Sequence, residues 1–200
     1  MTAARPASVA PTADVDPTAT VGAGSRVWHL AQIRESAAVG TNCTIGRGAY
    51  VGPGVTLGDN CKLQNYALVY EPARLSDGVF IGPAAVLTND VYPRAINPDG
   101  SLKSAEDWTS VGVTIGRGAS IGARAVCIAP VTIGAWATVA AGAVVTKDVP
   151  DHAIVVGVPA RQVGWVGEAG VPLEEVKNDI WLCPQSARQY RVSGGVLLGA

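Results

Sequence analysis

The sequence predicts an all-β protein in which the chain winds into a parallel β-helix, with one inserted loop and a short C-terminal extension. Three observations support this fold class. A branched aliphatic residue returns at every sixth position from Val9 to Leu87. The repeat breaks at Thr88-Asn89-Asp90 and resumes from Ile115 to Val145. We therefore expect a β-helix domain over residues 1–165, which includes the insertion, and an extension over residues 166–200.

Each six-residue unit has the chemistry of a short strand followed by a bend. A small residue stands two positions before each aliphatic, as Ala31 stands before Ile33, and residues two apart on a strand point to the same side. Glycine often follows the aliphatic, as at Gly46, and favours a corner. Bends every six residues close most simply into triangular coils of eighteen residues, stacked about 4.8 Å apart. Aliphatic side chains fill the interior, so a functional site must lie outside it.

Two segments depart from the repeat. The interval from Leu87 to Ile115 is not a multiple of six, so we expect residues 88 to about 110 to leave the coil and return. After residues 156–161 the period ends. The composition of Leu173–Lys177 suggests one or two helical turns, whereas residues 181–192 suggest a short hairpin.

The composition limits location and partners. The net charge of −1 gives no reason to expect binding to nucleic acid or to an anionic membrane. The segment Met1–Pro6 lacks the apolar stretch of a signal peptide, and no apolar run is long enough to span a bilayer, so we expect a cytoplasmic protein. Cys43 and Cys61 are one coil apart and Cys127 occupies an aliphatic position, which predicts reduced core thiols. Cys183 has no assigned role, and the four cysteines show no metal-binding spacing.

Over about residues 9–165 the chain resembles the left-handed parallel β-helix, or hexapeptide-repeat, acyltransferases. The chain also contains the segments Val27-Trp28-His29, Gln64-Asn65, Val69-Tyr70-Glu71, Gly82-Pro83, Thr88-Asn89-Asp90, Tyr92-Pro93-Arg94 and Gly157-Val158-Pro159-Ala160-Arg161. Through these segments it resembles, within that superfamily, the acetyl-CoA-dependent N-acetyltransferases of nucleotide-linked amino sugars, in the branch that acetylates a 3-amino group on a UDP- or dTDP-sugar. The resemblance implies a left-handed coil and a homotrimer that binds acetyl-CoA between adjacent subunits. We expect no metal.

Asn89 is the first candidate for the reaction centre. An amine that attacks a thioester must be neutral and held near the carbonyl carbon, and an Asn carbonyl can accept its hydrogen bond without acting as a base. The departing CoA thiolate can then take the proton. Alternatively, Asn89 has no catalytic role and only caps a turn. His29 is the competing catalytic candidate because other branches of the superfamily use a His base.

Further candidates surround these two residues. Coil stacking places Asn89 in the same corner column as Glu71 and Glu35, while His29 and Asn65 share another corner. One face of the coil separates the two corners, so we expect the site to form between subunits. We predict that the acceptor is bound by Asn65, Glu71, Asp90, Tyr92 and Arg94. The carboxylates can bind the sugar hydroxyls or an ammonium group, and the Arg can bind the nucleotide or a sugar carboxylate. Alternatively, each of these candidates is a solvated surface residue without a binding role.

The resemblance places the coenzyme near the last repeats. Lys147 and Arg161 suit its phosphates, and the backbone of Ala141 and Gly142 suits the pantetheine arm. An O-acyltransferase or a longer-chain acyltransferase of the same fold remains the nearest alternative. A non-catalytic assembly module is another, although a scaffold needs neither the insertion nor the last motif. Two His residues argue against a γ-class carbonic anhydrase, which needs three as metal ligands.

Overall fold

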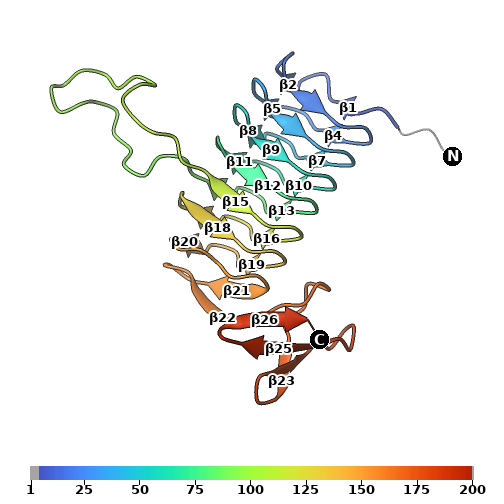
Figure 1. Ribbon diagram of the computed structural model, residues 1–200. Coiled ribbons are helices and arrows are strands. Elements are labelled where there is room, and N and C mark those ends of the chain that lie inside the picture. Colours follow the sequence, from blue (N-terminus) through green and yellow to red (C-terminus); the bar gives the residue numbers. More distant parts are fainter. Residues whose placement is uncertain (1–4, 200) are drawn as a thin grey trace.

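The protein, described for residues 5–199 by a computed structural model, is a parallel β-solenoid of about eight turns followed by an antiparallel sheet (Figure 1). The predicted all-β fold class is therefore confirmed. Residues 1–4, which belong to the segment examined for a signal peptide, and residue 200 lie outside the described residues. In the described range no helix is long and apolar enough to cross a membrane.

Three parallel sheets form the sides of the solenoid. Sheet 1 contains β1 (Ser8–Val9), β4 (Arg26–Val27), β7 (Thr44–Ile45), β10 (Lys62–Leu63), β13 (Phe80–Ile81), β16 (Ser120–Ile121), β19 (Thr138–Val139), β21 (Ala153–Val156) and β22 (Arg161–Trp165), the last of which is antiparallel to β21. Sheet 2 contains β2 (Asp14–Val15), β5 (Gln32–Ile33), β8 (Tyr50–Val51), β11 (Leu68–Val69), β14 (Val86–Leu87), β17 (Val126–Cys127) and β20 (Val144–Val145). Sheet 3 contains β3 (Thr20–Val21), β6 (Ala38–Val39), β9 (Thr56–Leu57), β12 (Arg74–Leu75), β15 (Val113–Ile115) and β18 (Val131–Ile133).

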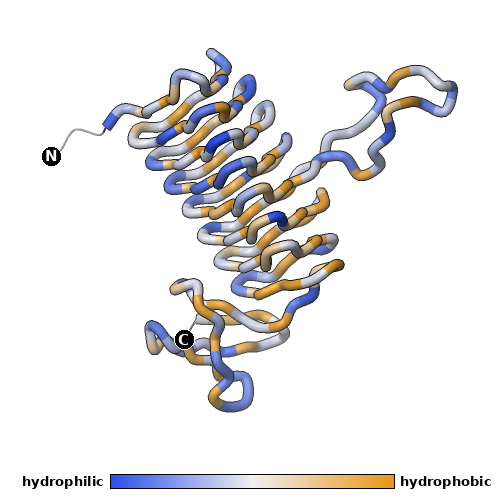
Figure 2. Tube along the Cα trace, turned by 180° about the vertical axis from the view of Figure 1, so that it is seen from behind, coloured by the Kyte–Doolittle hydropathy of each residue, from blue (hydrophilic) through white to orange (hydrophobic). Residues whose placement is uncertain are grey.

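The strands pair in the register that the repeat predicts. Val51 lies beside Val69, and Val69 lies beside Leu87, at intervals of eighteen residues. From Val27 onward these side chains are buried in one continuous core, and the hydropathy colouring alternates around each coil in Figure 2. At the N-terminal end Val9 is 46% exposed, because no coil of the described chain covers β1 on that side.

The predicted insertion leaves the solenoid between β14 and β15. Thr56 pairs with Arg74 after 18 residues, whereas Arg74 pairs with Thr114 after 40, a difference of 22 residues. The inserted segment projects sideways as a long arm in both ribbon views (Figures 1 and 2). We call residues 89–110 the arm. The coil closes across its base, because the Val111 amide donates a hydrogen bond of 3.0 Å to the Asn89 carbonyl.

The C-terminal segment forms a fourth, antiparallel sheet. Its strands are β23 (Glu174–Lys177), β24 (Ile180–Leu182), β25 (Gln189–Ser193) and β26 (Val196–Gly199). The predicted hairpin is confirmed, since Trp181 pairs with Tyr190. The helical prediction for Leu173–Lys177 is wrong: Glu174 and Glu175 instead pair with β24. Cys183, which directly follows β24, is buried and free. Cys43, Cys61 and Cys127 are also buried and free, as predicted for core thiols.

The corners between sheets differ in regularity. The 1/2 corner, between sheets 1 and 2, carries a residue with positive φ in coil after coil, including Leu30 (φ 60), Tyr66 (φ 61) and Arg124 (φ 57). At the 2/3 corner, between sheets 2 and 3, the same position is occupied by Ser36 (φ 57) and then, two coils later, by Pro72, whose ring forbids a positive φ. The regular turn therefore ends just before the arm.

Candidate functional site

The 2/3 corner carries one column of candidate residues. The register of sheet 2 stacks Glu35, Glu71 and Asn89 along this corner, with Lys147 two coils beyond Asn89. At about 4.8 Å per coil, Asn89 lies roughly 5 Å from the level of Glu71 and roughly 10 Å from that of Lys147. The structure thus brings the predicted reaction centre, one predicted acceptor residue and one predicted coenzyme residue to the same edge of the solenoid.

The base of the arm fixes Asn89 beside Glu71. The carbonyl of Asn89 is held by Val111, and the hydroxyl of the preceding residue, Ser110, donates a 3.1 Å hydrogen bond to the Glu71 carbonyl. The returning strand then passes tightly over the corner, since a Cβ built at Gly112 would lie 2.9 Å from the backbone of Pro72. Both ends of the arm are therefore anchored, while the half-buried Asn89 side chain remains available for a ligand.

A cluster that the sequence did not identify lies beside Glu71. The rings of Tyr50 and Tyr70 are 5.0 Å apart, centroid to centroid. Arg34 forms an ion pair of 2.8 Å with Glu35. The pKa of Tyr50 is raised, mainly by burial and then by the negative charge of Glu71, while Arg34 acts in the opposite direction. Arg34, Tyr50, Tyr70 and Glu71 are therefore electrostatic neighbours.

The 1/2 corner carries the other candidates. His29, Asn65 and Ala141 belong to one column of this corner, and Gly142 follows directly. His29 is exposed, and its Nδ1 lies 2.9 Å from the Thr12 hydroxyl. It also lines a hollow of about 970 Å³ near the N-terminal end. The side-chain oxygen of Asn65 accepts a 3.0 Å hydrogen bond from the Arg47 amide, so this oxygen already stabilises the corner.

The two corners are separated by the width of sheet 2 within one chain. The structure therefore does not bring His29 and Asn65 into contact with Glu71 and Asn89. The same outward position of sheet 2 holds Asp14 in β2 and Gln32 in β5. From β8 to β20 the outward residues form an apolar stripe between the corners, namely Tyr50, Leu68, Val86, Val126 and Val144, all partly buried. The corresponding positions of sheet 3 are mostly Thr, together with Ala38 and Arg74.

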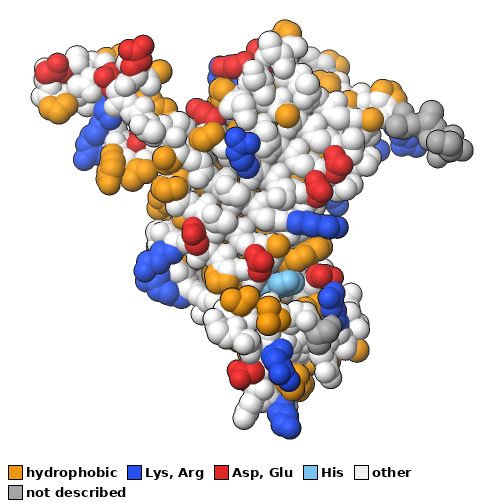
Figure 3. Space-filling view, in the orientation of Figure 1, with side chains coloured by type: hydrophobic (Ala, Val, Ile, Leu, Met, Phe, Trp, Pro, Cys, Tyr) orange, Lys and Arg blue, Asp and Glu red, His pale blue; other side chains and the backbone are white. Residues whose placement is uncertain are grey.

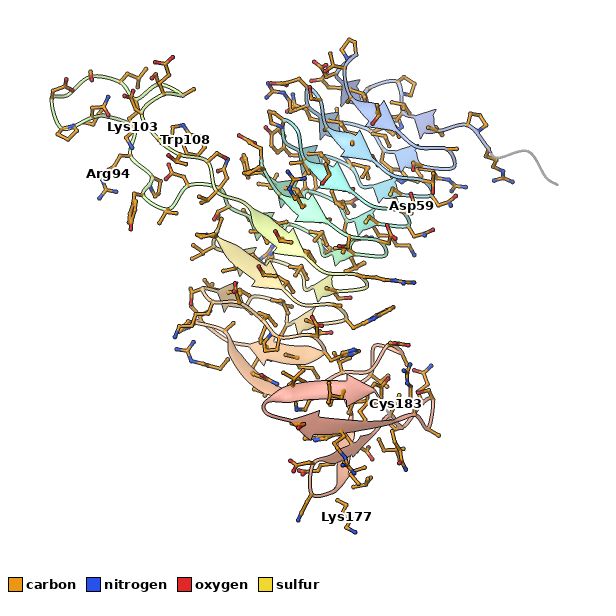
Figure 4. All side chains as sticks on the ribbon, viewed as in Figure 1. Asp59, Arg94, Lys103, Trp108, Lys177 and Cys183 are labelled. Carbon is orange, nitrogen blue, oxygen red and sulfur yellow. The ribbon has the colours of Figure 1, made fainter. Side chains whose placement is uncertain are left out.

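The acceptor candidates on the arm lie apart from the corner column. Asp90 accepts a 2.8 Å hydrogen bond from the Tyr92 amide, which forms a local turn. Tyr92 is 80% exposed, and Arg94 contacts the neighbouring Pro93 carbonyl and extends away from the solenoid in Figure 4. Figure 3 shows hydrophobic and charged side chains of the arm on the surface. Leu102, also on the arm, is 79% exposed.

The two basic candidates for the coenzyme lie together. Lys147 and Arg161 line one hollow of about 250 Å³ with Asp148 and Gln162. Ala141 and Gly142 lie at a different corner, where both are exposed. Gly142 has φ +71 and no atom within 4 Å of a Cβ built on it, which leaves its backbone open to close approach. Across residues 5–199 no group of three or more His, Cys, Asp or Glu side chains is placed to hold a metal ion.

Two family models match the chain. One is described as bacterial transferase hexapeptide (six repeats) and covers residues 39–71. The other is described as hexapeptide repeat of succinyl-transferase and covers residues 112–147. They lie on either side of the arm, within the two regular parts of the solenoid.

Curated relatives match parts of the chain. The dTDP-3-amino-3,6-dideoxy-alpha-D-galactopyranose 3-N-acetyltransferase of Aneurinibacillus thermoaerophilus is 41% identical over 40% of this chain and 41% of that protein. Serine acetyltransferase 4 of Arabidopsis thaliana is 40% identical over 46% of this chain and 25% of that protein. The chain therefore spans less than half the length of either relative.

A solved structure supports the fold assignment. The hexapeptide transferase family protein of Anaplasma phagocytophilum has a TM-score of 0.53 at 19% identity, covering 83% of this chain and 87% of that one. This likeness concerns the fold. Because hexapeptide models match on both sides of the arm and the chain folds as the solenoid that such repeats build, we conclude that the two regular parts of the solenoid are built from hexapeptide repeats like those of the bacterial transferases.

Proposed function

We propose that this protein transfers the acetyl group of acetyl-CoA to the amino group, at C3, of a UDP- or dTDP-linked amino-deoxy sugar. The observation that carries the proposal is the interrupted corner, where the arm holds Asn89 directly beside Glu71. Two relatives of about 40% identity are named acetyltransferases, and one acts by name on a dTDP-linked 3-amino sugar. A pure scaffold requires no such break in its repeat.

The proposed reaction is a direct attack. The Asn89 side-chain carbonyl accepts a hydrogen bond from the neutral amine and orients its lone pair toward the thioester carbonyl carbon. The nitrogen–carbon bond forms as the carbon–sulfur bond breaks, and the CoA thiolate takes the proton that the nitrogen loses. His29 is the alternative proton acceptor, supplied from the 1/2 corner. Asp90, Tyr92 and Arg94 remain proposed acceptor contacts from the arm.

The proposed coenzyme site uses two places on the surface. Lys147 and Arg161 pair with phosphate oxygens at their shared hollow, where two cations at one site favour an anion. Ala141 and Gly142 offer backbone groups to the pantetheine amides at the 1/2 corner. In the free chain these places lie on different corners, so one coenzyme uses both when it bridges two subunits.

We propose a homotrimer for this reason. The apolar stripe on sheet 2 lies between the two polar corners, and covering it with a second copy removes its exposed apolar surface from water. The same contact places the 1/2 corner of one subunit near the 2/3 corner of the next. We also propose a cytoplasmic location, which suits a chain with four free, buried cysteines.

O-acyl transfer is the second candidate, favoured by the serine acetyltransferase relative. Both candidates are tested by a thiol-release assay with acetyl-CoA and a panel of UDP- and dTDP-linked sugars that carry either an amino or a hydroxyl group. We expect thiol release with amino sugars. Release with hydroxy sugars alone would establish the second candidate, and no release together with no stabilisation by CoA would contradict both.

A further inference from the structure

Glu71 has a carboxylate that the rest of the described chain leaves unsatisfied. Its Oε2 atom is buried and has no hydrogen-bond partner among residues 5–199. The side chain as a whole is only half-buried, so the other carboxylate oxygen is the one that solvent or a ligand can reach. A buried acceptor without a partner is rare in native proteins and requires a specific reason.

The backbone below Glu71 is adapted to this carboxylate. A Cβ built at Gly52 would lie 2.5 Å from Oε2 and 2.9 Å from the Glu71 amide nitrogen. Any larger residue at position 52 would therefore occupy the place of the carboxylate. The glycine fixes the side chain against the corner with its second oxygen outward.

The charge of Glu71 is not neutralised by a neighbour. Arg34, the nearest basic residue of the cluster, uses both its Nε and its terminal nitrogen on Glu35, at 2.8 and 3.1 Å. The other ion pair of the described residues joins Arg188 to Glu168 in the C-terminal part. Tyr50 lies within range of the Glu71 charge, and the Tyr70 ring lies 5.0 Å from the Tyr50 ring, centroid to centroid. Aromatic faces attract cations.

We propose that Glu71, Tyr50 and Tyr70 form a cation-selective subsite that holds the protonated amino group of the acceptor and thereby selects amine acceptors over hydroxyl acceptors. The ammonium donates hydrogen bonds to the outward oxygen of Glu71 and lies against the aromatic pair. A neutral hydroxyl group at the same place leaves the carboxylate charge uncompensated. The subsite acts in binding, one coil from Asn89, and the bound ammonium releases one proton to water before the neutral amine attacks the thioester. It rests on the proposed function, and it explains a preference for nitrogen that the fold alone does not supply.

The test compares two probes that differ in one group. They are dTDP-3-amino-3,6-dideoxygalactose and its 3-hydroxy counterpart, dTDP-6-deoxygalactose. Calorimetric titration in the presence of CoA, which cannot react, measures the affinity of each. We expect the wild-type protein to bind the amino sugar at least about tenfold more tightly. This preference should vanish as the pH rises through the pKa of the sugar amine.

Three variants test the residue itself. In Glu71→Gln, which preserves the shape of the side chain, we expect the ratio of the two affinities to fall to about one. Glu71→Asp keeps the charge and should retain part of the preference. The exposed Glu174→Gln on β23 also removes one negative charge and should leave the ratio unchanged. Thermal unfolding of each variant confirms that it is folded.

The outcomes separate this inference from the proposed function. Thiol release with an amino sugar combined with an unchanged ratio in Glu71→Gln overturns the subsite alone. Absence of thiol release with the whole acceptor panel overturns the proposed function and the subsite together.

Discussion

Asn89 is the residue at which the repeat stops and the arm begins. Its backbone closes the coil through Val111, so its carbonyl serves the fold, while its side chain has no such structural task. This division predicts that the side chain can be removed without loss of structure. Glu71, one coil away, combines a hydrogen bond to the arm with an unsatisfied carboxylate oxygen.

Replacing Asn89 with alanine should lower the turnover number about 100-fold, because the amine loses the acceptor that orients it. The melting temperature should change by less than about 3 °C, since the backbone hydrogen bond to Val111 remains. Steady-state thiol release and thermal unfolding measure the two effects. Asn97→Ala, which removes an arm amide that contacts Ser101, is the control and should leave turnover unchanged. Unaltered turnover in Asn89→Ala would refute the assignment.

Asp59 illustrates a residue that serves the coil itself. Its Oδ1 accepts a 2.6 Å hydrogen bond from the Thr41 amide one coil below. The hydrogen bonds from Thr41 hold the pKa of Asp59 below its ordinary value of 3.8. Because the folded-state pKa is the lower one, the charged carboxylate stabilises the fold above the unfolded pKa, and this contribution is lost as the pH falls through the folded-state pKa.

Asp59→Asn keeps the acceptor oxygen and removes the titration. We expect the variant to melt at a lower temperature than the wild type at pH 7, and the difference to shrink as the pH falls below 3.8 toward the lowered folded-state pKa. Melting curves recorded at a series of pH values from 7 downward measure it. A difference in melting temperature that stays constant with pH would contradict the stabilising role of the Asp59 charge.

At the scale of elements, the arm is an addition to a coil that is complete without it. It adds 22 residues to one eighteen-residue interval, and its two ends meet at Asn89 and Val111. The solenoid strands on either side keep the same register. The arm therefore contributes little to the core, and it carries several of the proposed site residues.

Deleting residues 89–110 joins Thr88 to Val111 and places Ile115 six residues after Leu87. The repeat is thereby restored, and we expect a folded protein whose melting temperature lies within roughly 5 °C of the wild type. Circular dichroism and thermal unfolding test this expectation. Deleting residues 89–109 is the matched control, because a register error of one residue turns inward side chains outward. Equal stability of the two deletions would show that the register at the arm is unimportant.

Much of the element structure could be predicted from the sequence. The six-residue period specifies which residue of each strand is buried, and Val51, Val69 and Leu87 are aligned as expected. The strand at Glu174–Lys177 was missed because its register depends on pairing with Ile180–Leu182, and the segment itself shows no two-residue alternation. Local composition carried a weak helical signal that the antiparallel sheet overrode.

The sequence predicts which candidate residues stack above one another at one corner, but it does not predict side-chain contacts between different positions of the coil. Glu71 and Asn89 are eighteen residues apart, so stacking arithmetic placed them together. Tyr50 and Tyr70 are twenty residues apart, and their contact depends on the directions of two outward side chains. The ion pair of Arg34 with the adjacent Glu35 has the same origin. Such lateral contacts follow from side-chain geometry, which the period does not specify.

At the scale of the whole molecule, the solenoid separates the candidate residues onto two corners with an apolar stripe between them. Asn89 and Glu71 lie on one corner, and His29 and Asn65 lie on the other. One chain therefore presents two partial sites. The proposed association of copies through sheet 2 would join them.

Leu68→Arg places a charge in the middle of the stripe. We expect it to convert the proposed trimer largely to monomer and to abolish most of the activity, because desolvating an unpaired charge costs several kcal/mol. Light scattering coupled to gel filtration measures the mass, which should be three chain masses for the wild type. Thr56→Arg, at an outward position of sheet 3, should remain trimeric. A trimeric Leu68→Arg variant would place the interface elsewhere.

The central claim is acetyl transfer to nitrogen on a nucleotide-linked sugar, and analysis of the product tests it most directly. The wild-type protein is incubated with acetyl-CoA and a mixture of UDP- and dTDP-linked amino and hydroxy sugars, and the products are examined by mass spectrometry before and after mild alkali. An amide survives this treatment, whereas an acetyl ester is hydrolysed. We expect a single class of acetylated product that carries a nucleotide, originates from an amino sugar and resists alkali. An alkali-labile product, or no acetylated nucleotide sugar at all, would contradict the account.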